Sequence, residues 1–446
     1  MNHISKGEIL TIGFMMFSIF FGAGNLIFPP ALGQAAGEHV VIAMLGFLTT
    51  GVGLPLLGII AIALQGGKYI EFIRNMTYPW MATMLLVILY LTIGPLFAMP
   101  RTGAVSFEIG IRPFLAEENL SIGQLIYTAL FFGASYYLAL NPNKLIDRVG
   151  KILTPMLLII LAVLFVKAFV TPLGTIMDAT GSYIETPFVQ GFQDGYQTMD
   201  LLASLAIGTL VVNAVRMRGV TTNRAIGEIC LLAGIITVAL MAMVYGSLAY
   251  MGATSMSVLG HSENGGQLLA MAVSILFGQA GNIIIAITIA LACLTTCCGI
   301  TSGTAWFFNK LFKNQISYER LLLLSIIFSF IASNIGLTQL INLAIPFLVG
   351  IYPLVIVLVI LSLFDRFIGW RRSIYRGAMN CTLVFAILAG MAAADINIPG
   401  VSEFLTVYLP FYSIMMGWII PALAGAFAGW LYSLVQKPQS NEKMIN

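Results

Sequence analysis

Charged residues are scarce in this sequence. Only 9% of its 446 residues are Asp, Glu, Lys or Arg, whereas 59% are hydrophobic, and the mean hydropathy is +0.96. A soluble globular domain carries about 25% charged residues, so this composition excludes a soluble fold. Apolar runs long enough to cross a bilayer, which takes about 20 residues, recur along the whole chain. The composition therefore predicts one polytopic membrane domain with the lipid bilayer as its surroundings.

Cysteine and histidine are scarce as well, with five and three copies. An odd number of thiols in or beside apolar runs argues against a disulfide framework, and none has the spacing of a zinc site. We expect the cysteines to be small apolar packing residues. A membrane-embedded enzyme needs a nucleophile, an acid–base pair or a metal site at membrane depth, and the sequence offers no such cluster. We therefore expect neither an enzyme nor a bound cofactor.

Twelve apolar runs have the length of membrane spans. A shorter piece, Gly266–Phe277, precedes the eighth run and predicts a re-entrant or surface helix. Pro55 predicts a kink in the second run. The runs are Ile9–Gly33, His39–Leu64, Tyr78–Ala98, Ser121–Leu140, Lys151–Thr171, Gly195–Val215, Ile226–Met251, Gly281–Asn309, Tyr318–Gly336, Ile341–Phe364, Ile374–Ala394 and Thr406–Val435.

The positive charges alternate with these runs. If the N-terminus is inside, the inner segments hold 18 of the 21 Lys and Arg residues, among them Lys144, Arg148 and Lys151. Only Arg101, Arg112 and Lys167 lie in or near outer segments, where acidic residues such as Glu108 gather. This asymmetry predicts that both termini are cytoplasmic, with residues 437–446 as a tail. The cluster Arg371, Arg372 and Arg376 is typical of the same topology signal and of lipid contact, not of nucleic-acid binding.

The stretch FFGAGNLIFPP, residues 20–30, interrupts the first run. Glycine weakens a helix and proline removes a backbone donor. In hydrocarbon, freed backbone groups are tolerated only where they face protein, water or a ligand. Unwinding at Gly22, Ala23, Gly24 and Asn25 would expose N–H groups that favour a carboxylate and carbonyls that favour a cation or an ammonium group. The alternative is that the glycines only permit close helix packing.

A second interruption is predicted at ASLAIG, residues 203–208, in the sixth run. The two interruptions lie five runs apart, and an odd offset turns the second copy over in the membrane. The pattern predicts an inverted repeat of five plus five helices, residues 9–171 and 195–364, followed by two helices in residues 374–435. The whole of residues 1–436 would then form a single transporter domain.

Asp200 is the one carboxylate that lies more than one helical turn inside a run, since Glu228 and Glu319 stand at run ends. Intramembrane carboxylates are costly and usually functional, and Asp200 would attract a substrate ammonium group or take a proton. The alternative is a helix N-terminal residue stabilised by the helix dipole at the water boundary. Ser204 and Gly208 follow one and two turns later on the same face, so this face is a candidate pocket wall. Phe20, Phe21 and Phe28 are candidates for an apolar pocket.

The eighth run contains ACLTTCCGITSGT, residues 292–304, with Thr295 and Thr296 near its centre. Hydroxyl and carbonyl oxygens are the ligands that a small hard cation such as sodium prefers. Threonines in membrane helices also often bond their own preceding carbonyls, which is the alternative here.

The segment GFMMFSIFFGAGNLIFPPALG, residues 13–33, resembles the signature of the bacterial branched-chain amino acid:cation symporters, the BrnQ-type leucine/isoleucine/valine carriers. The resemblance extends over essentially the whole chain. The family is similar to the larger sodium-coupled superfamily with a five-plus-five broken-helix fold, the leucine-transporter-like fold. Residues 22–29 are similar to its G-x-G-N-x-x-F-P pattern, and residues 292–296 to its A-x-L-T-S pattern.

The resemblance implies a sodium ion held by the carbonyls of Ser18, Phe21 and Ala292 and by the hydroxyls of Thr295 and Thr296. It implies that Ala23 and Gly24 meet the substrate carboxylate. The resemblance also supplies the preference for leucine, isoleucine and valine. We therefore expect a sodium symporter that works by alternating access. Proton coupling or antiport in the same fold is the alternative, and a channel is less consistent with a broken-helix binding site.

Overall fold

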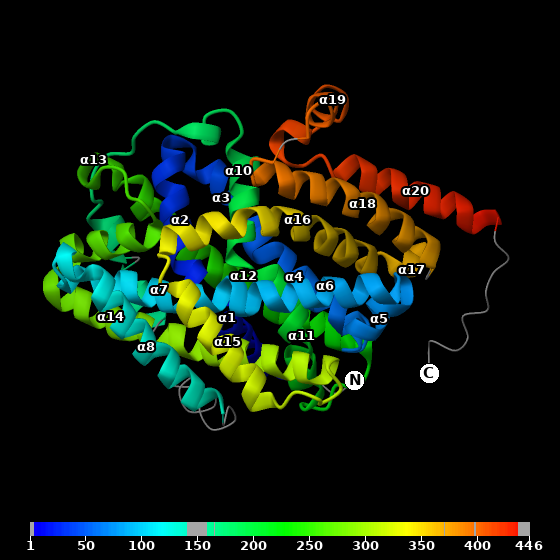
Figure 1. The fold of residues 1–446 in the computed structure, drawn as a ribbon, viewed down its shortest axis with the longest axis horizontal. Helices are drawn as coiled ribbons and strands as arrows, with labels where there is room; N and C mark the ends of the chain where they lie inside the picture. The colour runs from blue at the N-terminus through cyan, green and yellow to red at the C-terminus, as the bar shows by residue number, and fades with distance from the viewer. Residues whose placement is uncertain (1–3, 141–157, 165, 370, 397, 436–446) are drawn as a thin grey trace. The chain divides into compact units, whose positions relative to one another are not determined.

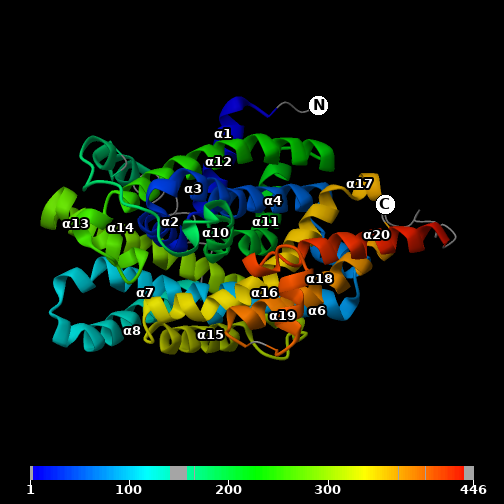
Figure 2. The ribbon, with the colours of Figure 1, turned by 90° about the horizontal axis from the view of Figure 1, so that it is seen from above.

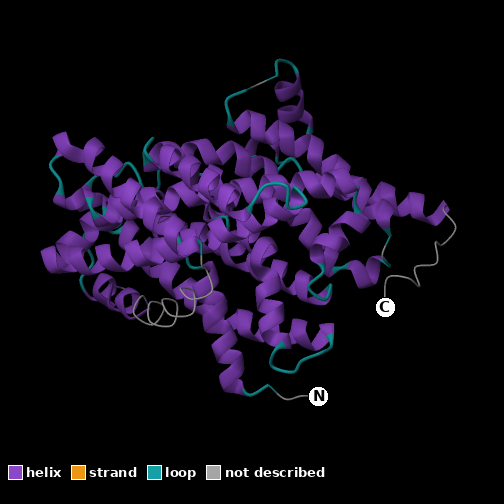
Figure 3. Ribbon diagram, turned by 60° about the horizontal axis from the view of Figure 1, so that its bottom comes forward, coloured by secondary structure: helices purple, strands orange, loops and turns teal. Residues whose placement is uncertain are grey.

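The computed structural model describes residues 4–140, 158–164, 166–369, 371–396 and 398–435. Throughout these ranges the elements are helices joined by loops, without a strand (Figure 3). Lys144, Arg148, Lys151, the start of the fifth predicted span and the tail 437–446 lie outside the described residues. The all-helical prediction is confirmed.

The described helices pack as two compact units, 4–63 with 88–344 and 64–87 with 345–435. The helices that lie wholly or mainly in the first unit are α1 (Lys6–Phe20), α2 (Ala23–Ala36), α3 (Val40–Leu48), α4 (Leu54–Leu64), α7 (Ala98–Gly110), α8 (Leu120–Ala139), α10 (Pro187–Asp194), α11 (Asp200–Arg216), α12 (Asn223–Ala253), α13 (Met256–Leu259), α14 (Gly265–Leu311) and α15 (Tyr318–Ser333) (Figure 1). The second unit holds α5 (Tyr69–Met76), α17 (Asp365–Ile368), α18 (Arg372–Ala393), α19 (Val401–Tyr408) and α20 (Ile419–Val435). Residues of α6 (Pro79–Leu91) and α16 (Leu337–Leu363) belong to both units.

Seven helical segments of the described chain are long and apolar enough to cross a membrane, or eight if the bent pair 187–198 and 200–216 is one span. Others are shorter, such as α1 with 15 residues and α20 with 17. These lengths establish a protein that crosses the membrane several times.

Several predicted boundaries need correction. The third span continues past Ala98 through α7, after a π-helical segment at Thr92–Leu96 with a non-helical Gly94. The last predicted span is two helices, α19 and α20, because Pro410 and the left-handed residues Phe411 and Met415 stop the helix between them. The predicted short helix before the eighth span is confirmed, since Gly278 has φ 64° and separates it from the rest of α14.

At the kink predicted in the second span, the structure has a change of helix type. A π-helical turn, Thr49–Gly53, separates α3 from α4 directly before Pro55. Proline lacks the N–H that would bond one turn back, so the preceding turn relaxes.

Helix α12 lies along both halves of the interrupted first helix, α1 and α2 (Figure 2). Close contacts between backbones hold α2 and α12 together. A Cβ added at Gly33 would be 1.9 Å from the Ala249 oxygen, and one at Gly252 would be 2.0 Å from the Pro30 oxygen. Small residues at such contacts let membrane helices approach closely. This packing fixes α2, and with it the start of α2, against α12.

In the second unit, close backbone contacts at glycines also join α18 and α20, which lie side by side in Figures 1 and 2. A Cβ at Gly377 would be 2.2 Å from the Gly425 oxygen, and a Cβ at Gly425 would be 2.3 Å from the Gly377 oxygen.

Candidate binding site at two helix breaks

The first helix is interrupted at Phe21 and Gly22. Helix α1 ends at Phe20, Phe21 and Gly22 are extended, with φ of −74° and −118°, and α2 begins at Ala23. The predicted break is therefore confirmed. It lies at residues 21 and 22, directly before Ala23, the residue between Gly22 and Gly24. Pro29 and Pro30 lie inside α2 and do not interrupt it.

The break leaves unpaired helix ends in the protein interior. The first N–H groups of α2, at Ala23 and Gly24, have no partner within the helix, and the helix dipole makes this end positive. The last carbonyls of α1 face the break from the other side. One of them, on Phe20, accepts a hydrogen bond of 3.0 Å from the Asn25 side-chain amide.

A second break lies between α10 and α11. A 3₁₀ turn, Gly195–Thr198, follows α10, and Met199 then adopts the left-handed conformation with φ 61°. Helix α11 begins at Asp200, and the two parts are bent by 47°. The Thr198 hydroxyl caps the new helix by accepting a 3.3 Å hydrogen bond from the Asp200 N–H.

This location corrects the sequence analysis, because residues 203–208 form no interruption. They lie inside the regular helix α11. Their small side chains serve close packing against α4: a Cβ at Gly58 would be 2.4 Å from the Ser204 hydroxyl, and a Cβ at Gly208 would be 2.6 Å from Ile62. Asp200, Ser204 and Gly208 do share one buried face of the helix, as predicted.

The two breaks meet through side chains. The Asn25 amide donates to the Asp200 carboxylate at 2.9 Å and also contacts the hydroxyl of Tyr245 on α12. The Tyr245 hydroxyl also lies beside the Asp200 carboxylate. Asn25, Asp200 and Tyr245 are 1%, 4% and 0% exposed. Asp200 thus begins a helix, as one alternative held, yet it lies in the interior and not at a water boundary.

Arg101 is a second charged residue at this place, and the sequence analysis put it in an outer segment. It lies on α7, is 2% exposed, and donates a 2.6 Å hydrogen bond to the Gln197 carbonyl in the 3₁₀ turn of the second break. Its guanidinium also lies 5.0 Å from the ring centroid of Phe28 on α2. Glu108, placed outside with it, is likewise a buried residue of α7, bonded to Arg112 at 2.6 Å.

The sequence around Arg101 contains a signal for its buried position. The segment AMPRTGAVSFEIG continues the third run as helix α7 although it contains Pro100 and Gly103, and its arginine and glutamate lower the hydropathy below that of a span. An arginine that follows directly on an apolar run is itself the signal, since charges inside a membrane domain mark functional places.

The residues predicted to hold sodium are only partly brought together. Thr296 lies beside the first break, because a Cβ on Gly22 would be 3.6 Å from its methyl group. Phe21 is buried within that break, whereas Ser18 is exposed on α1. Ala292 and Thr295 lie on α14, and the Thr295 hydroxyl donates to the Ala292 and Leu291 carbonyls at 2.9 and 3.2 Å. That bonding is the alternative noted for membrane threonines.

No group of three or more His, Cys, Asp or Glu residues in the described chain is arranged to hold a metal ion. All five cysteines are free, and four of them are buried.

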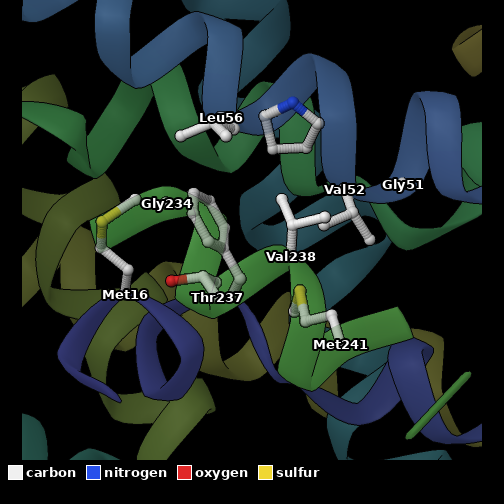
Figure 4. Close-up of a pocket in the computed structure, with 10 residues that line it drawn as sticks. Met16, Gly51, Val52, Leu56, Gly234, Thr237, Val238 and Met241 are labelled. Carbon is white, nitrogen blue, oxygen red and sulfur yellow. The ribbon is translucent and has the colours of Figure 1, made fainter. Parts of the chain in front are cut away.

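An apolar pocket borders the first break on the α1 side. It is lined by Met16 and Phe20 of α1, by residues 51, 52, 55 and 56, and by Gly234, Thr237, Val238 and Met241 of α12 (Figure 4). Met241 lies one helical turn before Tyr245, and Phe20 supplies the carbonyl that Asn25 bonds. The pocket thus lies next to the first break through Phe20, and Asn25, Asp200 and Tyr245 are not among its lining residues. Of the other candidate aromatic residues, Phe21 stacks on Phe17, and Phe28 faces Arg101.

Solved structures with a similar fold include a transporter. Mhp1, a nucleobase-cation-symport-1 family transporter with bromovinylhydantoin bound, matches with a TM-score of 0.57 at 14% identity, over 96% of this chain and 92% of that one. MhsT in complex with L-phenylalanine also matches with a TM-score of 0.57, at 16% identity, over 96% and 98%. At such identities the likeness establishes the fold.

Sequence relatives are closer. The branched-chain amino acid permease BraB of Bacillus subtilis (strain 168) is 46% identical over 437 residues, which are 98% of this chain and 98% of BraB. A branched-chain amino acid transport system 2 carrier protein of Pseudomonas aeruginosa is 42% identical over 426 residues, 94% of this chain and 95% of the relative. The model of the family "Branched-chain amino acid transport protein" matches residues 5–436. The chain therefore belongs to the family of branched-chain amino acid transport proteins, and it is a membrane transporter and not an enzyme.

Proposed function

We propose that this protein imports leucine, isoleucine and valine together with sodium, by alternating access. The observation that carries the proposal is the hydrogen bond between Asn25 and Asp200, which joins the two helix breaks at one buried place. Broken helices that meet inside the membrane present both helix ends that an amino acid needs.

The substrate zwitterion fits the two poles of this place. Its carboxylate would accept hydrogen bonds from the N–H groups at the start of α2, at Ala23 and Gly24, with Gly22 leaving room. Its ammonium group would lie between the Asp200 carboxylate and the last carbonyls of α1. Asn25 would hold the start of α2 and Asp200 in their relative positions. Ser204 and Gly208 would form the wall of the site on the buried face of α11. An aliphatic side chain has apolar surroundings in the residues next to Phe20.

Sodium would couple to the substrate at the same break. The nearness of Thr296 to Gly22 supports a site formed by the Phe21 carbonyl and the Thr296 hydroxyl, with Ser18, Ala292 and Thr295 as the other ligands. These are hard, uncharged oxygens of the type that sodium prefers. The Thr295 hydroxyl can bind the ion and keep its present hydrogen bond. Its hydrogen would still point to the backbone carbonyl, while a lone pair of its oxygen would face the ion.

The energy is sufficient for accumulation. One monovalent cation entering through about 100 mV releases about 2.3 kcal/mol. A tenfold sodium gradient adds about 1.4 kcal/mol. At one sodium per amino acid, the total of about 3.7 kcal/mol supports accumulation of a few hundredfold.

The architecture that we propose has twelve spans, in an inverted repeat of five plus five followed by two, with both termini cytoplasmic. The positive charges of the inner segments support this orientation. Arg101 lies in α7 and not in an outer segment, so the excess of positive charge in the inner segments over the outer ones is larger.

Asp200 favours a second candidate, proton coupling of the same substrates. A buried carboxylate between two movable half-helices is a group that could carry a proton with the substrate. In that case Asp200 would be neutral in one conformation and charged in the other.

Uptake of radiolabelled leucine into proteoliposomes tests the proposal. We expect uptake when sodium is outside, none when potassium replaces it, and competition by isoleucine and valine. Uptake driven by a proton gradient without sodium would favour the second candidate. Protein-free liposomes provide the background. Absence of leucine uptake under both gradients would contradict the proposal that leucine is a substrate.

A further inference from the structure

Arg101 introduces a positive charge that the proposed site has not yet used. Arginine stays protonated in proteins, and a charge inside a membrane domain is costly, so its position requires a reason. Its side chain is 2% exposed and belongs to α7, a helix that lies against both α2 and α14. The guanidinium therefore reaches the breaks from a third element, outside both broken helices.

Contacts with Gln197 and Phe28 help to hold the guanidinium in place. The Gln197 carbonyl accepts one of its hydrogen bonds at 2.6 Å, and the Phe28 ring lies 5.0 Å away as measured to its centroid. A guanidinium has five N–H donors that point outward in its own plane. The contacts with the aromatic ring and the carbonyl thus orient the guanidinium. Its planar fork of N–H groups matches the geometry of a carboxylate.

The guanidinium lies at the positive end of α2. A Cβ added to Gly24 would be 3.6 Å from Arg101 Nη1, so the group lies beside the first turn of that helix. The N–H groups of this turn and the guanidinium both favour an anion. A negative group here would meet backbone donors from α2 and side-chain donors from α7.

We infer that Arg101 binds the carboxylate of the transported amino acid, together with the N–H groups at the start of α2. This inference rests on the proposed function, since it assigns a further residue to the same site. Gln197, which holds Arg101, and Asp200, which accepts from Asn25, are three residues apart at the second break. The substrate therefore finds a fixed cation for its carboxylate and a fixed anion for its ammonium group, and these two charges set its orientation.

Equilibrium binding to the purified full-length protein tests this, with radiolabelled leucine displaced by leucine or by leucinamide in saturating sodium. Leucinamide keeps the ammonium group and the side chain but lacks the carboxylate. Arg101→Gln should weaken leucine binding about a hundredfold and leucinamide binding less than threefold. Arg101→Lys keeps the charge without the planar fork, and it should weaken leucine about tenfold. Because Arg101→Lys retains a cation in the same place, it also tests the inference if the Gln variant fails to fold.

Arg112→Gln is the matched control, because Arg112 is the other arginine near this helix and pairs with Glu108. It should leave the ratio of leucine to leucinamide affinity unchanged. A purely structural role for Arg101 predicts equal losses for both ligands, and that result, or unchanged leucine binding, would overturn the inference. Failure of the unmodified protein to bind leucine would instead contradict the proposed function.

Discussion

The two helix breaks of this protein look alike in outline but arise differently. At the first break, Phe21 and Gly22 are extended, a conformation open to any residue, and a Cβ at Gly22 would make only ordinary contacts, 3.6 Å from the Thr296 methyl group. At the second, Met199 is held at φ 61°, which a side-chain-bearing residue adopts at a cost of about 1–2 kcal/mol. The surrounding structure must impose that second conformation.

The comparison teaches where each break is encoded. Small residues beside Asn25 mark the first one locally, within a run that would otherwise be continuous. The second has no local signal, since Thr198 and Met199 are ordinary membrane residues and the glycine-containing stretch that follows is helical. Its position depends on contacts with other helices, including the hydrogen bond from Arg101 to Gln197.

Gly24→Leu should abolish leucine uptake, the largest effect that we expect. A Cβ at Gly24 already lies 3.2 Å from the Phe28 ring, and a leucine would cover the first turn of α2. Initial uptake rates in proteoliposomes measure this. Gly133→Leu on α8 is the control, because a Cβ there meets no heavy atom within 4 Å. Normal uptake by a well-inserted Gly24→Leu protein would contradict a binding role for the first break.

Asp200→Asn should reduce leucine uptake about a hundredfold, because it removes the charge that Asn25 and Tyr245 contact at the second break. The rate should be measured between pH 5 and 8, since proton coupling would also change the pH profile. Glu228→Gln, on the exposed ion pair with Arg224, should behave like the unmodified protein. If Asp200→Asn transports normally at every pH, the carboxylate only begins a helix.

Thr296→Ala should raise the sodium concentration needed for half-maximal uptake about tenfold, because it removes the hydroxyl that we propose as a ligand beside the first break. Thr288→Ala is the matched control on the same helix, because the Thr288 hydroxyl bonds the Ile284 carbonyl at 2.8 Å. An equal sodium requirement in both variants would remove Thr296 from the ion site.

Met199→Ile should destabilise the protein by about 1–2 kcal/mol, the smallest effect in this series. Isoleucine keeps the buried apolar volume but tolerates the left-handed conformation less than methionine does. Met251→Ile, at a buried helical position of α12, should cost less, because isoleucine adopts helical angles readily. Unfolding in detergent compares the two, and equal losses would mean that Met199 is not strained.

Much of the fold could be predicted because it depends on composition and local pattern. The apolar runs identify the membrane helices, and the glycines at 22 and 24 locate the first break. The site was harder, because Asp200 and Arg101 gain their meaning from partners distant in sequence: Asn25 and Tyr245 for the first, Gln197 and Phe28 for the second. Hydropathy even misplaced Arg101, since a buried charge makes a helix resemble a loop.

The central claim is that one site at the two breaks couples sodium to the amino acid, and equilibrium binding tests it most directly. The dissociation constant of leucine should be measured in sodium and in potassium, and that of sodium with and without leucine. We predict that sodium strengthens leucine binding about tenfold or more, and that leucine strengthens sodium binding by the same factor, as thermodynamic linkage requires. Equal leucine affinity in sodium and potassium would contradict the claim.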